Sequence, residues 1–476
     1  MERKIIHSVG IDIGTTTTQV IFSDLTVVNR APASQVAVYE FVDRYISYQS
    51  PVVFTPINHQ GMIDTDRLRV FIDSQFELAG LAGKGVESGA IIITGETAKA
   101  DNARVAVMDL SQQLGDFVVA TAGPNLESVI AGRGSGAQKY SQDNHQKVMN
   151  IDVGGGTSNF VIFDCGRVVD TACLNIGGRL IELNEQGGCH YIHKPGVAVI
   201  KELFGDSFNP RDLTLDHLNR VAVRMAELIV ELIQGKMTKL TAHLLQTPEL
   251  KDIANIDAIF FSGGVGECYY QQQKKSFDST QFGDIGPLLA RALLRNSAIS
   301  AMPICKPSQT LRATVIGAGA YSLSLSGSTI WLYADELPLK NIPVVHPAID
   351  WQQPTPDICN EIVIAAERMD LVLGCDRYVV ALDTGMPEKY YAVQHAAKEL
   401  AKFYRDHGNH NDPALVVVQN DIGKALGMEL QPLLLPQALT VIDEVITREG
   451  DYIDIGKSYF GGEIVPLTVK SLAFPS

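Results

Sequence analysis

The sequence predicts an α/β protein in which two similar domains face one another across a ligand-binding cleft, followed by a further α/β module. Residues 150–163 read as a strand, a glycine-rich hairpin and a second strand, because apolar β-forming residues flank three consecutive glycines. Residues 10–22 repeat this pattern without a gap, at an offset of 152 − 12 = 140 residues. Beyond residue 358, short apolar runs alternate with a helical pattern, as in βαβ units. The repeated hairpin therefore predicts two similar domains, and the alternation predicts the third module.

Each hairpin combines a carboxylate with glycines and hydroxyl groups. Adjacent glycines turn tightly and let backbone N–H groups approach an anion without a Cβ in the way. The predicted phosphate contacts are Gly14, Thr15, Thr16 and Thr17 in the first hairpin and Gly154, Gly155, Gly156 and Thr157 in the second. Asp12 and Asp152 precede the turns, where a carboxylate would repel bare phosphate, so a divalent cation is expected to mediate. Taken alone, residues 150–163 could also be an ordinary glycine hairpin.

The composition is that of a soluble globular protein, since 46% of the 476 residues are hydrophobic and 20% are charged. The net charge of −15, with no evident Lys/Arg cluster, argues against a nucleic-acid partner. No apolar stretch approaches the length needed to span a bilayer, and the N-terminus runs into a strand without a signal sequence, so no membrane association is expected. The seven cysteines are scattered and odd in number, which fits a reducing cytoplasm.

Several elements are predicted around the two hairpins. They are strands at 90–94, 116–122 and 256–261 and helices at 126–132 and 215–245. The helix at 126–132 is rich in small residues, which permit close helix–helix approach and suit a crossover between domains. The strand at 256–261 runs into the glycine-rich turn 262–267, where Gly263, Gly264 and Gly266 would let a flat or anionic ligand lie against the backbone.

The predicted division of the chain follows these elements. It comprises a first domain at 1–145, a second domain at 146–334, a proline-rich connection at 335–357 and a C-terminal α/β module at 358–476. In the module we expect strands at 361–364, 378–382 and 414–418 and a helix at 390–407. None of these segments carries a recognisable catalytic motif.

Five segments in order resemble the actin-like ATPases, which include sugar kinases and the large heat-shock chaperones. The segments are Asp12–Thr18, 123–132, Asp152–Thr157, Ser262–Glu267 and Gly317–Tyr321. They resemble, respectively, the first phosphate loop, the first connecting helix, the second phosphate loop, the adenosine loop and the second connecting helix of that superfamily. The resemblance spans about residues 5–325 and implies duplicated actin-like (ribonuclease H-like) ATPase domains.

A closer resemblance covers the whole chain, which is similar to the reactivating factors of ethanolamine ammonia-lyase. It is carried by residues 10–22, 121–128 and 450–456, with Gly461 and Gly462. The resemblance implies an ATP-dependent, magnesium-requiring, chaperone-like factor. Such a factor would release inactivated cobalamin from ethanolamine ammonia-lyase so that intact adenosylcobalamin can enter, within bacterial ethanolamine catabolism in the cytosol or a microcompartment. It leaves self-association into a homo-oligomer open.

The resemblance also implies roles for individual residues. Asp12 and Asp152 would hold Mg²⁺ through waters, and Gly263, Gly264 and Gly266 would accept the adenosine of ATP. In related proteins a Glu or Gln at the start of the first connecting helix positions the attacking water. Here that place reads Ala-Gly-Pro-Asn at 122–125, so Asn125 and Glu127, one turn later, are the candidate catalytic residues. This departure predicts slow hydrolysis, as expected of a timer.

Three other functions compete with this one. A small-molecule kinase of the sugar-kinase type would have the same fold and should form product in proportion to ATP consumed. A nucleotide-binding filament or scaffold protein should scatter light in an ATP-dependent way. A reactivase of another cobalamin-dependent lyase, such as diol dehydratase, would differ in its C-terminal module and its subunit pairing.

Overall fold

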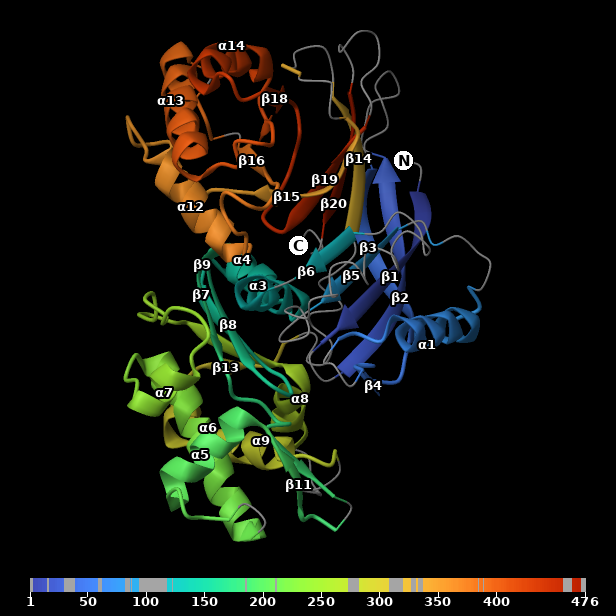
Figure 1. Cartoon of the computed structure of the whole chain (residues 1–476), viewed down its shortest axis with the longest axis vertical. Coiled ribbons are helices and arrows are strands. Elements are labelled where there is room, and N and C mark those ends of the chain that lie inside the picture. Colours follow the sequence, from blue (N-terminus) through green and yellow to red (C-terminus); the bar gives the residue numbers. More distant parts are fainter. Residues whose placement is uncertain are drawn as a thin grey trace.

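The computed structural model describes most of the chain and arranges it around three β-sheets (Figure 1). The described residues are 3–14, 17–29, 39–58, 62–81, 86, 88–93, 118–121, 123–184, 186–209, 212–272, 282–307, 320–326, 331–332, 337–383, 385–387, 389–456 and 465–471. Within these ranges, no helix is both long enough and apolar enough to cross a membrane.

The first sheet has the strand order β3-β2-β1-β5-β6, with the short β4 paired to β2. Its strands are β1 (Arg3–Ile13), β2 (Thr17–Asn29), β3 (Tyr39–Gln49), β4 (Val53–Phe54), β5 (Ser88–Ile93) and β6 (Val118–Thr121). Helix α1 (Thr65–Leu78) begins where the Asp64 side chain accepts a hydrogen bond from the N–H of Arg67 at 3.1 Å. Its Leu68 and Ile72 pack on the apolar side chains of β1.

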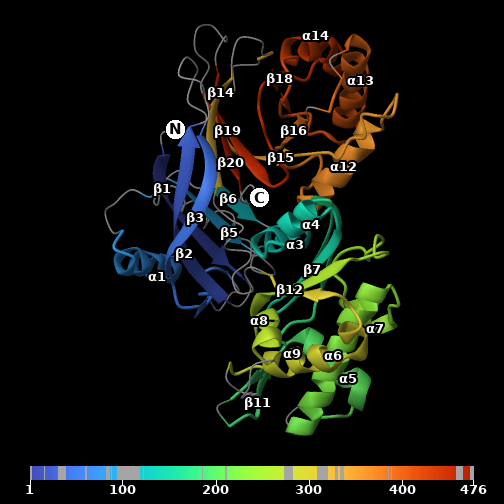
Figure 2. The same cartoon turned by 180° about the vertical axis from the view of Figure 1, so that it is seen from behind.

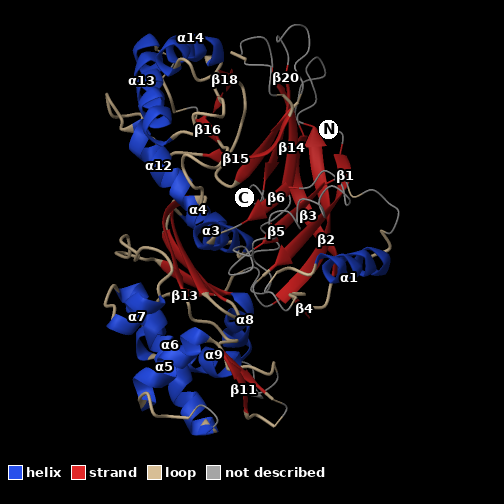
Figure 3. Ribbon diagram, viewed as in Figure 1, coloured by secondary structure: helices blue, strands red, loops and turns tan. Residues whose placement is uncertain are grey.

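The second sheet has the order β13-β12-β7-β8-β9. Its strands are β7 (Lys147–Val153), β8 (Ser158–Asp164), β9 (Arg167–Leu174), β12 (Ala258–Ser262) and β13 (Ile304–Cys305), with a separate hairpin of β10 (Ile181–Leu183) and β11 (Cys189–Ile192). The helices that accompany it are α5 (Lys194–Phe204), α6 (Leu215–Gln234), α7 (Lys239–Leu244), α8 (Gly263–Gln271), α9 (Gly286–Arg295) and α10 (Ser297–Ser300). The helix expected over 215–245 is two helices, because Gly235 ends α6 in the left-handed region at φ 64°. Figures 2 and 3 show these helices gathered at the opposite end of the molecule from the C-terminal module.

The two sheets have the same topology, which confirms the predicted duplication. In each, three antiparallel strands are followed by two parallel ones, so β3-β2-β1-β5-β6 corresponds to β9-β8-β7-β12-β13. The register also agrees, since Asp12 pairs with Gln19 and Asp152 with Asn159. Each turn closes with the same backbone hydrogen bond of 2.9 Å, from residue 14 to residue 17 and from residue 154 to residue 157.

Helix α3 (Pro124–Gly134) lies where the sheets meet and is followed by α4 (Ala137–Asn144). Leu126 and Ile130 of α3 share an apolar cluster with strand β5 of the first sheet and with Met369 and Tyr452 of the C-terminal module. On another side, Val129 packs against the second sheet. A Cβ on Gly132 would lie 2.5 Å from a side-chain carbon of Val161, so this approach requires a glycine. The predicted crossover helix is therefore confirmed.

The third sheet has the order β14-β20-β19-β15-β16-β17-β18. Its strands are β14 (Ala320–Ser326), β15 (Leu339–Val345), β16 (Val379–Leu382), β17 (Ala414–Val418), β18 (Leu439–Ile442), β19 (Asp451–Ile455) and β20 (Val465–Ser471). Strands β15 to β18 are parallel and alternate with α12 (Ile358–Arg368), α13 (Tyr390–His407) and α14 (Gly423–Leu434). The helices cover one face, and β19 and β20 share the apolar cluster of the other face.

Three predictions about this region are wrong. The segment 335–357 is not a connection throughout, because β15 lies inside it and pairs with β16 and β19. Pro343 is tolerated there since the ladder to β16 begins only at Val344. Residues 361–364 belong to helix α12, which Asp357 caps. Of the connecting helix expected over Gly317–Tyr321, the last two residues form the start of β14, and the others lie outside the described residues.

Candidate active site

Three carboxylates from three different elements converge between the first two sheets. Asp12 is near the end of β1, Asp152 is near the end of β7, and Glu127 is in the first turn of α3. Burial raises the pKa of the Glu127 carboxyl well above its usual range, and the charges of Asp12 and Asp152 raise this pKa further. The sequence predicted all three, and the structure brings them close enough for their charges to interact.

Asp152 is held by a short chain of hydrogen bonds. The Ser262 hydroxyl donates to its Oδ1 at 2.6 Å, and the Asn150 side-chain amide donates to that hydroxyl at 3.1 Å. Ser262 reaches Asp152 because the two residues are register partners on the parallel strands β12 and β7. Burial raises the pKa of Asp152 to about 6, although the hydrogen bond from Ser262 acts in the opposite direction. A carboxylate whose charge is this costly would be stabilised by a bound cation.

An amide side chain stands across the hairpin from each aspartate, Gln19 opposite Asp12 and Asn159 opposite Asp152. The Gln19 Oε1 and Asn159 Oδ1 atoms are buried and accept no hydrogen bond from the described residues. Sequence analysis overlooked this pair, although the two residues also stand 159 − 19 = 140 positions apart. Carboxylate and amide oxygens are the ligands that Mg²⁺ and its bound waters prefer.

The donor set therefore fits a magnesium ion. Within the described ranges, no three His, Cys, Asp or Glu side chains already form a metal-ligand cluster. Mg²⁺ commonly keeps several waters and uses only one or two protein carboxylates. The arrangement accordingly suits an ion that contacts Asp12 and Asp152 through its hydration shell, together with the phosphates of a ligand.

The tip of the second hairpin is fixed by the loop at 177–179. The N–H groups of Gly178 and Arg179 donate to the carbonyls of Gly154 and Gly155 at 2.9 and 2.7 Å. A Cβ on Gly177 would lie 2.4 Å from the Gly155 carbonyl oxygen, so only glycine permits this approach. These contacts hold the turn in which Gly156 and Thr157 were predicted to contact phosphate.

The first hairpin is fixed by a side chain instead. The Thr55 hydroxyl donates to the Gly14 carbonyl at 2.7 Å and lies 3.1 Å from the Thr18 hydroxyl. Thr17 pairs with Phe54 of β4, which brings that short strand beside the turn. Thr15 and Thr16, the other two predicted phosphate contacts, lie outside the described residues.

The predicted adenosine loop has a different local structure. Gly263, Gly264 and Gly266 form the first turns of helix α8, which follows β12 directly. Gly263 has φ 81°, and a Cβ there would lie 2.5 Å from the Val153 carbonyl oxygen, whereas Gly264 has open space around it. A helix N-terminus beside the second hairpin presents unpaired N–H groups and a favourable dipole for an anion.

Asn125 does not serve the carboxylate cluster as predicted. Its side-chain N–H group donates to Asp370 Oδ1 at 3.1 Å, and its Oδ1 accepts from the Thr171 hydroxyl at 3.0 Å. Asp370 also accepts from the N–H of Leu126 at 2.8 Å, so it caps α3. Asn125 therefore joins α3 to the C-terminal module, and Glu127 is left as the candidate that faces the aspartates.

Arg179 is a further residue that sequence reasoning missed, because no motif marks it. Its Nε lies 3.5 Å from Asp284 Oδ2, and its Cζ lies 4.5 Å from the centre of the Phe54 ring. Phe54 belongs to the first sheet and Arg179 to the second half of the molecule, so this cation–π contact joins the two halves. The Arg179 Nη1 atom is buried and forms no hydrogen bond within the described part of the chain.

Two sheets of one topology, each presenting an aspartate on a hairpin to a shared site, define the actin-like ATPase fold. The sequence model of one family within that class, described as ethanolamine utilisation protein EutA, matches residues 4–475. This chain belongs to that family.

Two full-length relatives are similar to this chain. The chain is 53% identical over 476 residues to "Ethanolamine ammonia-lyase reactivase EutA" of Salmonella typhimurium, with all of both chains covered. It is 52% identical over 482 residues to the protein of that name from Escherichia coli, again with full coverage of both.

Among solved structures, an Aquifex aeolicus Ppx/GppA phosphatase is 16% identical, covers 65% of this chain and 98% of its own, and has a TM-score of 0.38. The ethanolamine utilization protein EutJ from Carboxydothermus hydrogenoformans is 13% identical, covers 66% and 88%, and has a TM-score of 0.33. These values are too low for either structure to inform the site.

Proposed function

We propose that this protein is an ATP-dependent reactivase of ethanolamine ammonia-lyase, which releases damaged cobalamin so that intact adenosylcobalamin can bind again. The observation that carries the proposal is the convergence of Asp12, Asp152 and Glu127 between two sheets of one topology. Support for the lyase as partner comes from the name of two full-length relatives, each more than half identical to this chain.

In this proposal ATP lies between the two hairpins. Its phosphates contact the turns at residues 14–17 and 154–157, and its adenosine lies against the start of α8 at Gly263, Gly264 and Gly266. Asp12 and Asp152 would hold Mg²⁺. When bound, Mg²⁺ would neutralise negative charge on the phosphates of ATP. The N-terminus of α8 adds a dipole that favours the ligand's negative charge.

Glu127 is the residue that positions the attacking water or accepts its proton. Burial and the neighbouring aspartate charges raise the pKa of this carboxyl, which favours its holding a proton. The hydrogen bond to Asn159 limits the shift and orients the group. Because Asn125 in the same turn is hydrogen-bonded to Asp370 and Thr171, Glu127 acts without it, and we expect hydrolysis to be slow, on the scale of a conformational timer.

The C-terminal module is the part through which hydrolysis acts on the lyase. Asp370 of this module caps α3, and Asn125 of α3 binds the same carboxylate. Loss of the γ-phosphate changes the contacts that favour the closed arrangement of the two sheets, so the populations of open and closed states shift. A movement of α3 would be passed to the module through these hydrogen bonds.

The proposed setting is the cytoplasm or a bacterial microcompartment. In that setting, adenosylcobalamin-dependent ethanolamine ammonia-lyase is the partner and released cobalamin is a by-product. The cysteines agree with a reducing compartment, because all seven are free.

The test is recovery of ethanolamine ammonia-lyase that has been blocked with cyanocobalamin. Lyase, Mg²⁺, ATP and fresh adenosylcobalamin are mixed with the native protein, with Asp152→Asn, or with Asp143→Asn, a control that removes an exposed carboxylate of α4. We expect recovery with the native protein and the control and none with Asp152→Asn. Recovery by all three would refute the assigned site, and recovery by none, with active lyase present, would refute the function.

A further inference from the structure

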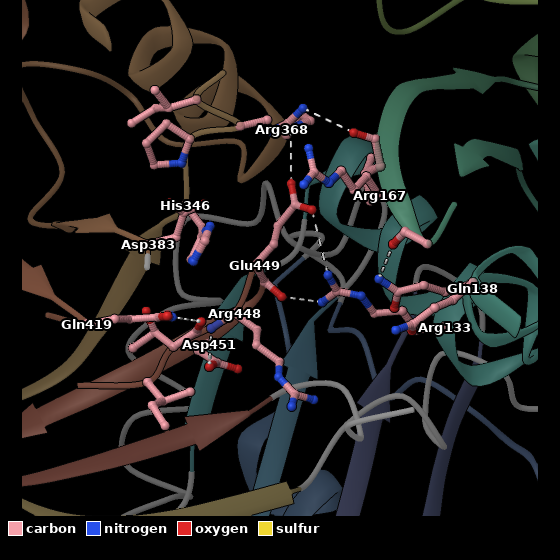
Figure 4. A pocket seen from close by; sticks show the side chains of 18 residues that line it. Arg133, Gln138, Arg167, His346, Arg368, Asp383, Gln419, Arg448, Glu449 and Asp451 are labelled. Atoms are coloured by element: carbon pink, nitrogen blue, oxygen red, sulfur yellow. Dashed lines mark hydrogen bonds and ion pairs between the residues drawn. The ribbon is translucent and has the colours of Figure 1, made fainter. Parts of the chain in front are cut away.

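A cavity whose lining includes neither Asp12 nor Asp152 lies between the α3–α4 segment and the C-terminal module (Figure 4). Its volume is about 450 Å³, which falls within the range of small-molecule sites. Part of its wall is the carboxyl edge of the parallel strands: His346 follows β15, Asp383 follows β16, and Gln419 follows β17. In open α/β sheets, ligands bind at this edge.

Arginines dominate the charge of this cavity. Four of them line it, and they come from α3, the start of β9, α12 and the segment before β19: Arg133, Arg167, Arg368 and Arg448. Three acidic residues, Asp383, Glu449 and Asp451, also line it, so the formal charge is 4 − 3 = +1. In a chain of net charge −15, such a concentration of guanidinium groups indicates that the cavity attracts anions.

Glu449 holds two of these arginines imperfectly. Its Oε1 lies 3.0 Å from the Arg368 Nε without the alignment of a hydrogen bond, and its Oε2 lies 3.6 Å from an Arg133 Nη. Arg133 also donates to the backbone carbonyl of Glu449. Figure 4 shows the carboxylate between the two guanidinium groups. A carboxylate with these loose contacts occupies the place that a better-matched oxyanion would take.

Two further buried polar atoms of the wall have no hydrogen-bond partner among the described residues. The Arg133 side chain is 8% exposed and its Nε makes no hydrogen bond to any described residue. Thr447 is 2% exposed and its hydroxyl likewise has no partner there. A buried donor without a partner is costly, and such groups are retained where a ligand satisfies them.

We propose that this cavity binds a small-molecule oxyanion, a phosphate or a carboxylate, which displaces Glu449 from Arg133 and Arg368 and accepts hydrogen bonds from Arg133 and Thr447. Phosphate and carboxylate each present two oxygens on one central atom, and guanidinium groups bind such a pair in a bidentate manner. The site does not depend on the proposed reactivase function.

Calorimetric titration with inorganic phosphate and, separately, with succinate tests the proposal. The titrations are run without nucleotide, because the phosphates of an ATP analogue would compete for this cavity, and the variants below separate it from the proposed nucleotide site. We expect at least one probe to bind, and which of them does so identifies the ligand as phosphate or carboxylate. Failure of both probes to bind the full-length protein would overturn the proposal.

Two variants and a control locate the site. Thr447→Val should weaken binding about fivefold through loss of one hydrogen bond, yet raise the unfolding temperature of the free protein by removing a buried unsatisfied hydroxyl. Arg448→Gln should weaken binding about tenfold. Arg405→Gln removes the same charge from the exposed face of α13 and should leave binding unchanged. Equal affinity in Thr447→Val and the native protein would refute this location.

Discussion

The two hairpins carry the same aspartate in the same register, but they differ in what stands beside it. On the neighbouring parallel strand, Asp152 faces Ser262, whose hydroxyl donates to it, whereas Asp12 faces Ile92, which offers no polar group. The duplication thus kept the carboxylate and the turn, while only the second half supplies a hydroxyl from the next strand. The hydrogen bond from Ser262 thus fixes the orientation of Asp152 from the neighbouring strand.

The two halves also differ in the contacts that hold the hairpin turn in place. Backbone N–H groups of residues 178 and 179 fix the second turn, and a side-chain hydroxyl, that of Thr55, fixes the first. The second sheet shares a large apolar cluster with α5 to α9, whereas the corresponding cluster of the first sheet contains α1 among the described helices. The two turns are therefore held by different kinds of contact, and the following variants test what each contact contributes.

The largest effect is expected from Asp152→Asn. The pKa of Asp152 is raised from 3.8 to about 6 in the folded protein. Without a cation, ionisation of this carboxyl therefore lowers the free energy of unfolding above pH 6. This loss disappears as the pH falls toward 4, because the carboxyl is then protonated in the folded protein. At pH 7 the variant should therefore be more stable than the native protein by about 3 kcal/mol, and the difference should vanish near pH 4.

Chemical denaturation at both pH values, with and without Mg²⁺, checks this prediction. Mg²⁺ should stabilise the native protein at pH 7 and leave the variant unaffected, and its affinity for the native protein should fall as the pH drops through about 6. A variant that is less stable than the native protein at pH 7 in the absence of Mg²⁺ would contradict the assignment.

Gly177→Ala tests the backbone support of the second turn. The new Cβ would lie 2.4 Å from the Gly155 carbonyl oxygen, so the turn must move, and we expect a loss of about 2 kcal/mol in the free energy of unfolding. Gly156→Ala, in the same turn with open space at its Cβ, should change stability by less than about 0.5 kcal/mol. Similar losses in the two variants would show that the contact at residue 177 is unimportant.

Ser262→Ala tests the hydroxyl that only the second half supplies. Removing it should cost about 1 kcal/mol of stability and weaken Mg²⁺ binding about tenfold, because Asp152 loses the group that orients it. The control is Ser158→Ala, which removes a buried hydroxyl that donates to the Ile176 carbonyl at 2.7 Å. Both variants should be destabilised, but Mg²⁺ affinity should fall in Ser262→Ala alone.

The smallest effect is expected where the halves touch. Phe54→Leu keeps an apolar side chain but removes the ring beneath Arg179, which should cost about 0.5 kcal/mol at this exposed position. Phe282→Leu, an exposed phenylalanine elsewhere in the second half, provides the control in the same denaturation experiment. If the two variants lose equal stability, the contact between Phe54 and Arg179 contributes nothing measurable.

Local patterns predicted much of this fold. The hairpins at residues 10–22 and 150–163 depend on neighbouring residues, so their glycines and β-forming flanks were sufficient to predict them. Short apolar runs were ambiguous. Residues 361–364 predicted a strand, but they belong to an 11-residue helix that Asp357 caps. Prolines near β15 suggested a connection because sequence alone did not reveal where the ladder to β16 begins.

The sequence by itself determined the two aspartate hairpins, the crossover helix and the family, because each depends on local hydrogen bonding or on a long run of matching residues. Only the tertiary structure decided that Glu127 faces both aspartates while Asn125 binds Asp370, since the two side chains differ by half a turn of one helix. It also decided that Arg133, at the far end of that helix, lines a second cavity with residues more than 200 positions away. Contacts between residues so far apart in the chain depend on how the sheets pack together, and no local sequence pattern predicts them.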